Sequence, residues 1–176
     1  MLREDHIHVM IDQVTLEKRI QELGEQISAE YQGKELTLIC ILKGGAMFMT
    51  QLSKYIPGPM KMDFMVLSSY GNDLISSGEV NIKKDLDGSI DGQHVLIVED
   101  IVDTGRTLWF LKDLLKDRGA ASVKICTMLD KPARRVMPVE VDYTGFQIQD
   151  EFVLGYGLDY EQYYRNLPYI AYVKQD

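Results

Sequence analysis

A continuous string of thirteen residues, Val95 to Thr107, constrains this chain more than any other feature. It begins with four apolar residues typical of a buried β-strand, continues with the acid pair Glu99-Asp100, and ends in a small loop that opens a helix. Strands alternating with helices indicate an α/β fold with a parallel sheet covered on both faces. Functional sites of such sheets gather beyond the carboxyl ends of the strands, so we expect one here.

The loop at the end of this string has the composition of a phosphate cradle. Gly105 lets the backbone turn tightly and approach a ligand, and successive amides at a helix N-terminus attract an anion. Thr104 and Thr107 add hydroxyl donors, and Arg106 adds a positive charge. The loop therefore predicts a phosphate-binding site.

The two acids require a separate explanation, because a bare phosphate site would not place carboxylates nearby. Glu99 and Asp100 are acceptors that suit the two hydroxyls of a ribose, or waters around Mg²⁺. Taken singly, the acid pair and the turn that starts at Asp103 are as typical of an ordinary strand end and helix cap. The whole string instead favours a ribose phosphate, since the chain has neither a Walker-type lysine loop nor a dinucleotide glycine fingerprint.

The rest of the chain predicts one α/β domain over residues 1–176, without linkers or repeats. An amphipathic helix is expected from Thr15, as its N-cap, to about Tyr31. The other expected elements are strands at Leu36–Leu42, Met62–Ser68, Val95–Val98 and Val123–Leu129, and helices at Ala46–Tyr55 and Leu108–Arg118, the last closed by Gly119.

Charge and composition restrict the partners. The net charge of −8 argues against nucleic acid and anionic membranes as partners, and anionic substrates would need local cations, backbone amides or a metal. No signal peptide follows the acidic start, and the longest apolar run, Leu36–Leu42, is too short to span a bilayer. Cys40 and Cys126 lie in apolar runs without metal-ligand spacing, which predicts buried reduced thiols and a cytoplasmic location.

The string from Val95 to Thr107 resembles the binding motif for phosphoribosyl diphosphate (PRPP) of the type I phosphoribosyltransferases. Four further segments, at residues 42–45, 69–71, 129–132 and 150–160, narrow the resemblance to the bacterial branch that acts on hypoxanthine and guanine. It implies a central parallel sheet flanked by helices, with a small hood formed from the terminal segments. It also implies transfer of phosphoribosyl from PRPP to hypoxanthine or guanine with Mg²⁺, which yields IMP or GMP and pyrophosphate.

The same resemblance implies roles for the residues around PRPP. Glu99 and Asp100 would hold the ribose diol and a metal ion, and Asp103 would accept the proton of the purine. The 5′-phosphate would be wrapped by Thr104, Gly105, Arg106 and Thr107. Pyrophosphate would meet Lys43, Gly44 and Arg165, and the Leu42–Lys43 peptide can be cis in this family. Arg106 stands where many members carry lysine, and both residues supply a cation.

The resemblance also implies a purine pocket. Lys131 would donate to the exocyclic oxygen of the base, Phe152 would stack on the ring, and the Val153 backbone would bond its edge. Because a buried donor is left unpaired by the amino group of adenine, we expect adenine to be rejected. Asp159 would join a second metal site. Ser69 and Tyr70 would form the tip of a mobile lid at about residues 69–79.

Other interpretations of these residues remain open at this stage. Phe152 and Val153 would be ordinary core positions if taken alone, and Lys131 and Arg165 ordinary surface charges. No role is assigned to the adjacent pair at positions 134 and 135. The protein can also be a non-catalytic PRPP sensor, although the pyrophosphate loop, the lid and the catalytic acid are all kept. Pyrimidines are disfavoured as substrates, xanthine is not, and a homodimer or homotetramer is expected from the family.

Overall fold

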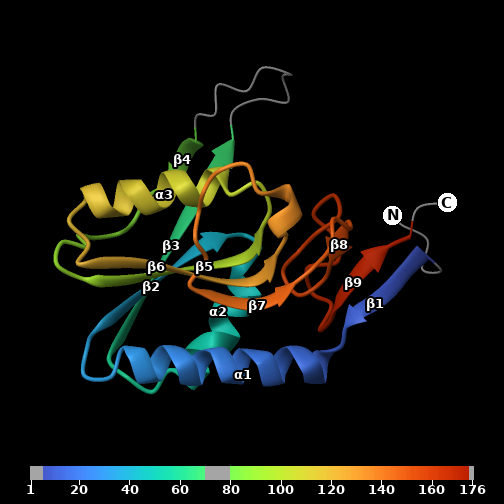
Figure 1. Cartoon of the computed structure of the whole chain (residues 1–176), viewed down its shortest axis with the longest axis horizontal. Coiled ribbons are helices and arrows are strands. Elements are labelled where there is room, and N and C mark those ends of the chain that lie inside the picture. Colours follow the sequence, from blue (N-terminus) through green and yellow to red (C-terminus); the bar gives the residue numbers. More distant parts are fainter. Residues whose placement is uncertain (1–5, 70–79, 175–176) are drawn as a thin grey trace.

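The computed structural model describes residues 6–69 and 80–174, and its centre is a twisted sheet in the strand order β4-β3-β2-β5-β6-β7 (Figure 1). The strands are β2 (Leu36–Leu42), β3 (Met60–Ser69), β4 (Val80–Lys84), β5 (His94–Val102), β6 (Ser122–Asp130) and β7 (Tyr143–Gln147). All pair in parallel except β4, which runs antiparallel to β3 at one edge. The parallel α/β sheet expected from the sequence is confirmed.

Helices cover both faces of this sheet. They are α1 (Gln13–Glu30), α2 (Gly45–Leu52) with the 3₁₀ turn η2 (Ser53–Tyr55), and α3 (Arg106–Asp117). Figure 1 shows α3 on one face and α1 and α2 on the other. Along β2, Leu38 and Cys40 enter the core beneath α1 and α2, whereas Ile39 and Ile41 enter the core beneath α3. This double burial explains why β2 is apolar at every position except Thr37 rather than alternating.

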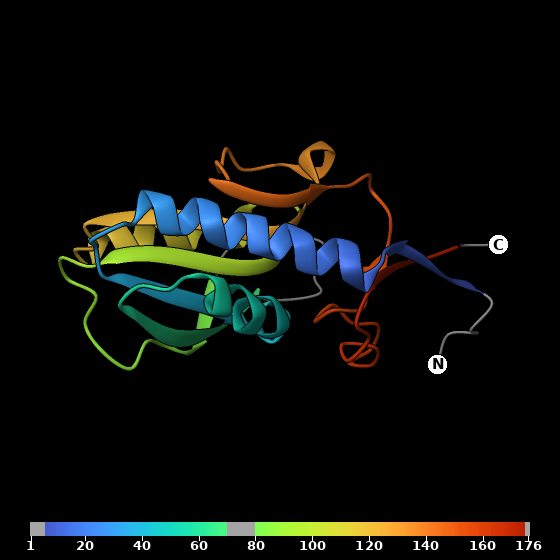
Figure 2. The same ribbon diagram turned by 90° about the horizontal axis from the view of Figure 1, so that it is seen from below.

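Segments close to the two termini form the expected hood. It is a small antiparallel sheet in the order β1-β9-β8, built from β1 (Ile7–Ile11), β8 (Val153–Leu154) and β9 (Ile170–Val173). Figures 1 and 2 both place it at one end of the molecule, beyond the N-terminal end of α1. None of the described helices is long and apolar enough to cross a membrane.

Several sequence-based boundaries were wrong, among them the start of β3, which lies at Met60 rather than Met62. The N-cap of α1 is Asp12, not Thr15, because the Asp12 side chain accepts from the Thr15 amide at 2.9 Å. β5 does not stop at Val98 but runs to Val102, because its ladder with β6 continues past the point where pairing with β2 ends. The acid pair therefore lies within the strand.

Another wrong boundary is the start of α3, which begins at Arg106 rather than at Leu108. Two residues of the predicted phosphate loop thus belong to the first helical turn. The helix expected over Ala46–Tyr55 is present, but its last turn tightens into η2. Gly119 follows the end of α3 in the left-handed region, with φ 84°, as its closing position predicts.

Candidate functional site

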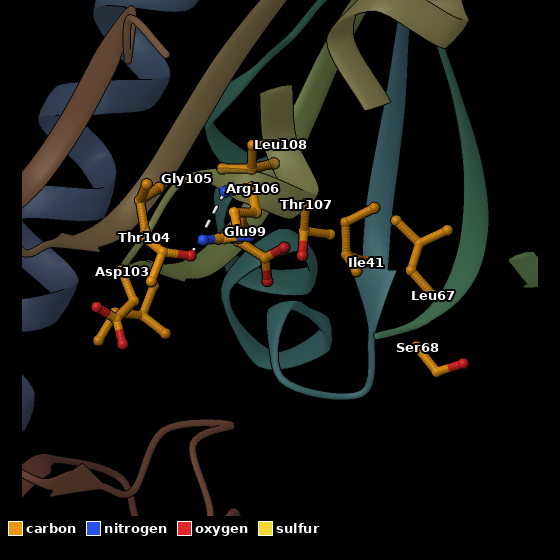
Figure 3. Close-up of a pocket in the computed structure, with 12 residues that line it drawn as sticks. Ile41, Leu67, Ser68, Glu99, Asp103, Thr104, Gly105, Arg106, Thr107 and Leu108 are labelled. Atoms are coloured by element: carbon orange, nitrogen blue, oxygen red, sulfur yellow. Dashed lines mark hydrogen bonds between the residues drawn. The ribbon is translucent and has the colours of Figure 1, made fainter. Parts of the chain in front are cut away.

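A cavity of about 430 Å³ opens at the carboxyl ends of β2, β3 and β5. Residues 103–108 and Glu99 line one side, and Ile41, Leu67 and Ser68 line another (Figure 3). The cavity therefore brings together residues that the sequence predicted for ribose and phosphate binding. Its position agrees with the general rule for sites in parallel sheets.

The phosphate loop is fixed by its backbone. Gly105 has φ 79° and is the N-cap of α3, and a Cβ placed there would lie 2.7 Å from Cγ1 of Val139 and 3.0 Å from Cδ of Arg135. The carbonyl of Thr104 accepts from the amides of Val136 and Met137 at 2.9 and 3.0 Å. The N-cap Gly105 has no side chain to cap this helix end, and the Arg106 amide is 3.5 Å from Oγ1 of Thr104, so the other first-turn amides are suited to an anion.

Negative charge on the acid pair is unfavourable. Burial and the neighbouring Asp100 raise the pKa of Glu99 well above its usual value, and burial also raises the pKa of Asp100, against the pull of Arg165. Few internal donors relieve this charge, the clearest being the amide of Ile101, 2.8 Å from Oδ1 of Asp100. Hydroxyl donors or a divalent cation would stabilise the pair, so these residues fit both a ribose and Mg²⁺.

The Lys43-Gly44 loop packs directly against the acid pair, and the peptide between Leu42 and Lys43 is cis. A Cβ at Gly44 would overlap the Asp100 carboxylate, with its Cγ at 2.5 Å. On the other side, a Cβ at Gly157, which has φ 99°, would overlap the carbonyl of Gly44. Asp100, Gly44 and Gly157 are therefore stacked without room for a side chain between them.

The predicted pyrophosphate residues lie together. Arg165 donates through Nη1 to the carbonyl of Gly157 and pairs through Nη2 with Oδ1 of Asp159, both at 2.7 Å. Its Nη2 is also 3.3 Å from Oε1 of Gln162, which accepts from Nζ of Lys43 at 3.0 Å. The sequence assigned no role to Gln162. In the sequence, only its position between Asp159 and Arg165 could have indicated a role.

Asp103 has a partner that sequence reasoning missed. Nε of Arg134 donates to Oδ1 of Asp103 at 2.9 Å, and Nη1 donates to Oδ2 of Asp150 at 3.3 Å. The bond to Asp103 is the main cause that raises the pKa of the arginine. Its neighbour Arg135 pairs instead with the buried Asp130. The available signal was the pair of adjacent arginines soon after Lys131.

The residues predicted to bind the purine lie where β6 ends and where β8 begins. Lys131 is only 7% exposed, and its Nζ donates to the carbonyl of Glu151 at 2.6 Å, so it is not an ordinary surface charge. Val153 is buried in β8, whereas Phe152 is 48% exposed. The Phe152 ring meets Tyr160 edge-on at 5.8 Å between centroids, which leaves exposed ring surface for a planar base.

The predicted lid lies almost entirely outside the described residues. Ser69 is the last residue of β3, and Tyr70 with the rest of the predicted lid falls outside the described residues.

Within residues 6–69 and 80–174, no three His, Cys, Asp or Glu side chains converge as a ready metal site. Asp159 does not form such a group with Glu99 and Asp100, and its oxygens are engaged by Arg165 and by the amide of Gln162.

Comparison with known proteins identifies the family. The sequence pattern of the Phosphoribosyl transferase domain matches residues 10–161, so the chain belongs to the phosphoribosyltransferase family. Within that family its full-length relatives are hypoxanthine-guanine phosphoribosyltransferases. That of Streptococcus thermophilus is 47% identical over 176 residues, and that of Bacillus subtilis is 48% identical over 174, with 98% and 97% of those proteins covered.

Two further similarities define the extent of the match. The Bifunctional protein TilS/HprT of Listeria innocua is 51% identical over 175 residues, and the chain spans 27% of that longer protein. The crystal structure of a hypoxanthine phosphoribosyltransferase from Staphylococcus aureus has a TM-score of 0.93 and 47% identity, with 97% of this chain and 93% of that chain covered. The expected fold is confirmed.

Proposed function

We propose that this protein transfers the phosphoribosyl group of PRPP to hypoxanthine or guanine, with release of pyrophosphate and formation of IMP or GMP. One observation carries the proposal: the uncapped start of α3, with its hydroxyl-rich loop, and the carboxylate of Glu99 line the same cavity. Donors for a phosphate and acceptors for sugar hydroxyls are thereby placed in one site. The names of the full-length relatives support the same activity.

The reaction is a displacement at the anomeric carbon of PRPP. The bond to pyrophosphate breaks with its electron pair on the leaving oxygen, and a purine nitrogen forms the new bond to the ribose. The protein's task is to align the two reactants and to neutralise charge on the departing group. Lys43 and Arg165 supply the positive charge next to Gly44, where both contact Gln162.

Asp103 is the proposed proton acceptor for the purine. As the base loses its proton to an Asp103 carboxylate oxygen, positive charge on the new nucleotide is removed, a contribution of roughly 10²- to 10⁴-fold in typical enzymes. Arg134 already occupies Oδ1 of Asp103. The proton is therefore proposed to go to the other oxygen, or to Oδ1 after the guanidinium has moved.

Specificity for 6-oxopurines is assigned to Lys131. Its ammonium group is buried and bonded to the carbonyl of Glu151, the residue that precedes the exposed Phe152. A base stacked on Phe152 would bring its exocyclic oxygen to this donor, with its edge bonded to the backbone of Val153. Adenine offers an amino group at the same position, so the Lys131 N–H directed at the base finds no acceptor there, although the ammonium keeps its bond to the carbonyl of Glu151.

Mg²⁺ is the proposed cofactor, held by Glu99 and Asp100 together with the ribose hydroxyls. When bound, it supplies neutralising charge to the diphosphate. The raised pKa of both carboxyls supports this assignment, because a dication favours their ionised forms. Asp159 is kept as a candidate for the second metal site, where it would have to exchange its contact with Arg165.

Several wider properties are proposed from the family resemblance. The lid at about residues 69–79, with Ser69 and Tyr70, would exclude water during the reaction. A cytoplasmic location and a homodimer or homotetramer complete the proposal, with no nucleic acid or membrane as partner. Light scattering of the purified protein tests the assembly, since a monomeric mass would contradict it.

The activity is tested by nucleotide formation from PRPP and Mg²⁺ with hypoxanthine, guanine, xanthine and adenine offered separately. We expect conversion of hypoxanthine or guanine and none of adenine. Conversion of adenine would contradict the role of Lys131. PRPP binding without the formation of any nucleotide would indicate that the protein is a PRPP sensor and not an enzyme.

A further inference from the structure

The side chain of Gln162 lies between two cations that the proposed function assigns to pyrophosphate. Its Oε1 accepts from Nζ of Lys43 at 3.0 Å and from Nη2 of Arg165 at 3.3 Å. The two donors come from distant parts of the chain, the loop after β2 and the segment between β8 and β9. A single neutral carbonyl oxygen is therefore the shared acceptor of both cations.

The surroundings of this oxygen hold it in place. Gln162 has φ 72°, and its own amide donates to Oδ2 of Asp159 at 2.8 Å. Arg165 is fixed in turn by the carbonyl of Gly157 and by Oδ1 of Asp159. The carboxamide is thus presented from a backbone loop that is tied to the same arginine it contacts.

An oxygen within hydrogen-bond reach of both a lysine and an arginine occupies a position where an anionic oxygen would bind more strongly, because bonds between two charged groups exceed those with one. Two of the three residues in contact are those proposed to meet pyrophosphate. We propose that Oε1 of Gln162 is a resident stand-in for a diphosphate oxygen, which PRPP or pyrophosphate displaces. Gln162 would then set the affinity of this subsite.

Two opposing effects follow from such a stand-in. It keeps Lys43 and Arg165 directed at one point while the site is empty, and it competes with the incoming diphosphate. The competition is mild, since Gln162 and Lys43 are exposed and a neutral amide is a weaker acceptor than a phosphate. A carboxylate at the same position would compete strongly, and an apolar side chain would not compete at all.

The inference is tested with Gln162→Met and Gln162→Glu, by titrating pyrophosphate and then PRPP, each with Mg²⁺, into the purified protein in a calorimeter. Met keeps the unbranched shape without a strong acceptor, and we expect its pyrophosphate affinity to rise about two- to tenfold. Glu forms charged bonds to both cations, and we expect affinity to fall by about tenfold or more. The Michaelis constant for hypoxanthine should stay unchanged in both.

Asn166→Asp is the matched control, because it adds the same negative charge to an exposed position in the same loop. A loss with Asn166→Asp as large as that with Gln162→Glu would show that charge alone is responsible, and would overturn the inference. Weaker binding by both Gln162 variants would do the same, since it would assign the residue a structural role only. If the unaltered protein bound neither pyrophosphate nor PRPP, the proposed function itself would fail.

Discussion

The stacking of Gly44 on Asp100 yields a prediction that is specific to this packing. Gly44 has φ −60° and ψ −44°, so alanine would meet no backbone strain at this position. Its methyl group would nevertheless overlap the Asp100 carboxylate, which would have to rotate away. Gly44→Ala should therefore act through Asp100 rather than through the backbone.

The magnitude follows from what the rotation breaks. Oδ1 of Asp100 would lose its 2.8 Å bond from the amide of Ile101, worth about 1 kcal/mol. Leaving its rotamer well would cost about 0.5–1.5 kcal/mol more. We expect Gly44→Ala to lower the free energy of unfolding by about 1–3 kcal/mol, and to weaken PRPP binding because the displaced carboxylate no longer meets the ribose.

A double-mutant cycle separates this contact from other effects. In an Asp100→Ala background the overlapping atoms are gone, so Gly44→Ala should be neutral or stabilise by up to about 1 kcal/mol. Urea unfolding followed by circular dichroism measures all four proteins, with Gly58→Ala as a control because no atom lies within 4 Å of its Cβ position. An equal loss in both backgrounds would refute the stacking argument.

Three further predictions concern single residues. Asp103→Asn should lower turnover by roughly 10²- to 10⁴-fold while PRPP still binds, and wild-type turnover in a stopped assay would remove its role in proton transfer. Lys131→Met should reduce kcat/KM for hypoxanthine by about 10- to 100-fold, the worth of a charged hydrogen bond, and an unchanged value would contradict the purine pocket. Burial, aided by Glu99, raises the pKa of Cys40 to about 12. Since the thiolate appears only as pH approaches that value, mass spectrometry should find no alkylation of folded protein at about pH 8, and a modified Cys40 there would contradict its burial.

The fold was predictable where the local pattern and the tertiary environment agree. β2 is apolar except at Thr37 and is buried on both faces, so its bounds were correct. β5 was cut short because its ladder with β6 continues through charged residues that no strand pattern favours. The N-cap of α1 was misplaced because Asp12 and Thr15 are both good capping residues, and only the bond between them decides.

The site was predictable where its residues are consecutive. Residues 99–107 form one string, and all of them except Asp100 line the cavity. Arg134 could not be assigned, because its contact with Asp103 joins positions 31 residues apart. Gln162 and Lys43 are 119 residues apart, and they meet only where the segment between β8 and β9 packs against the loop after β2. The hood itself followed from the family resemblance, since β8 is too short to give a strand pattern.

The most direct test of the central claim is ³¹P NMR of the purified protein with PRPP and Mg²⁺, before and after hypoxanthine is added. We predict that pyrophosphate and IMP then appear together in equal amounts, while PRPP alone stays intact. Release of pyrophosphate without hypoxanthine, or no change after its addition, would contradict phosphoribosyl transfer at this site.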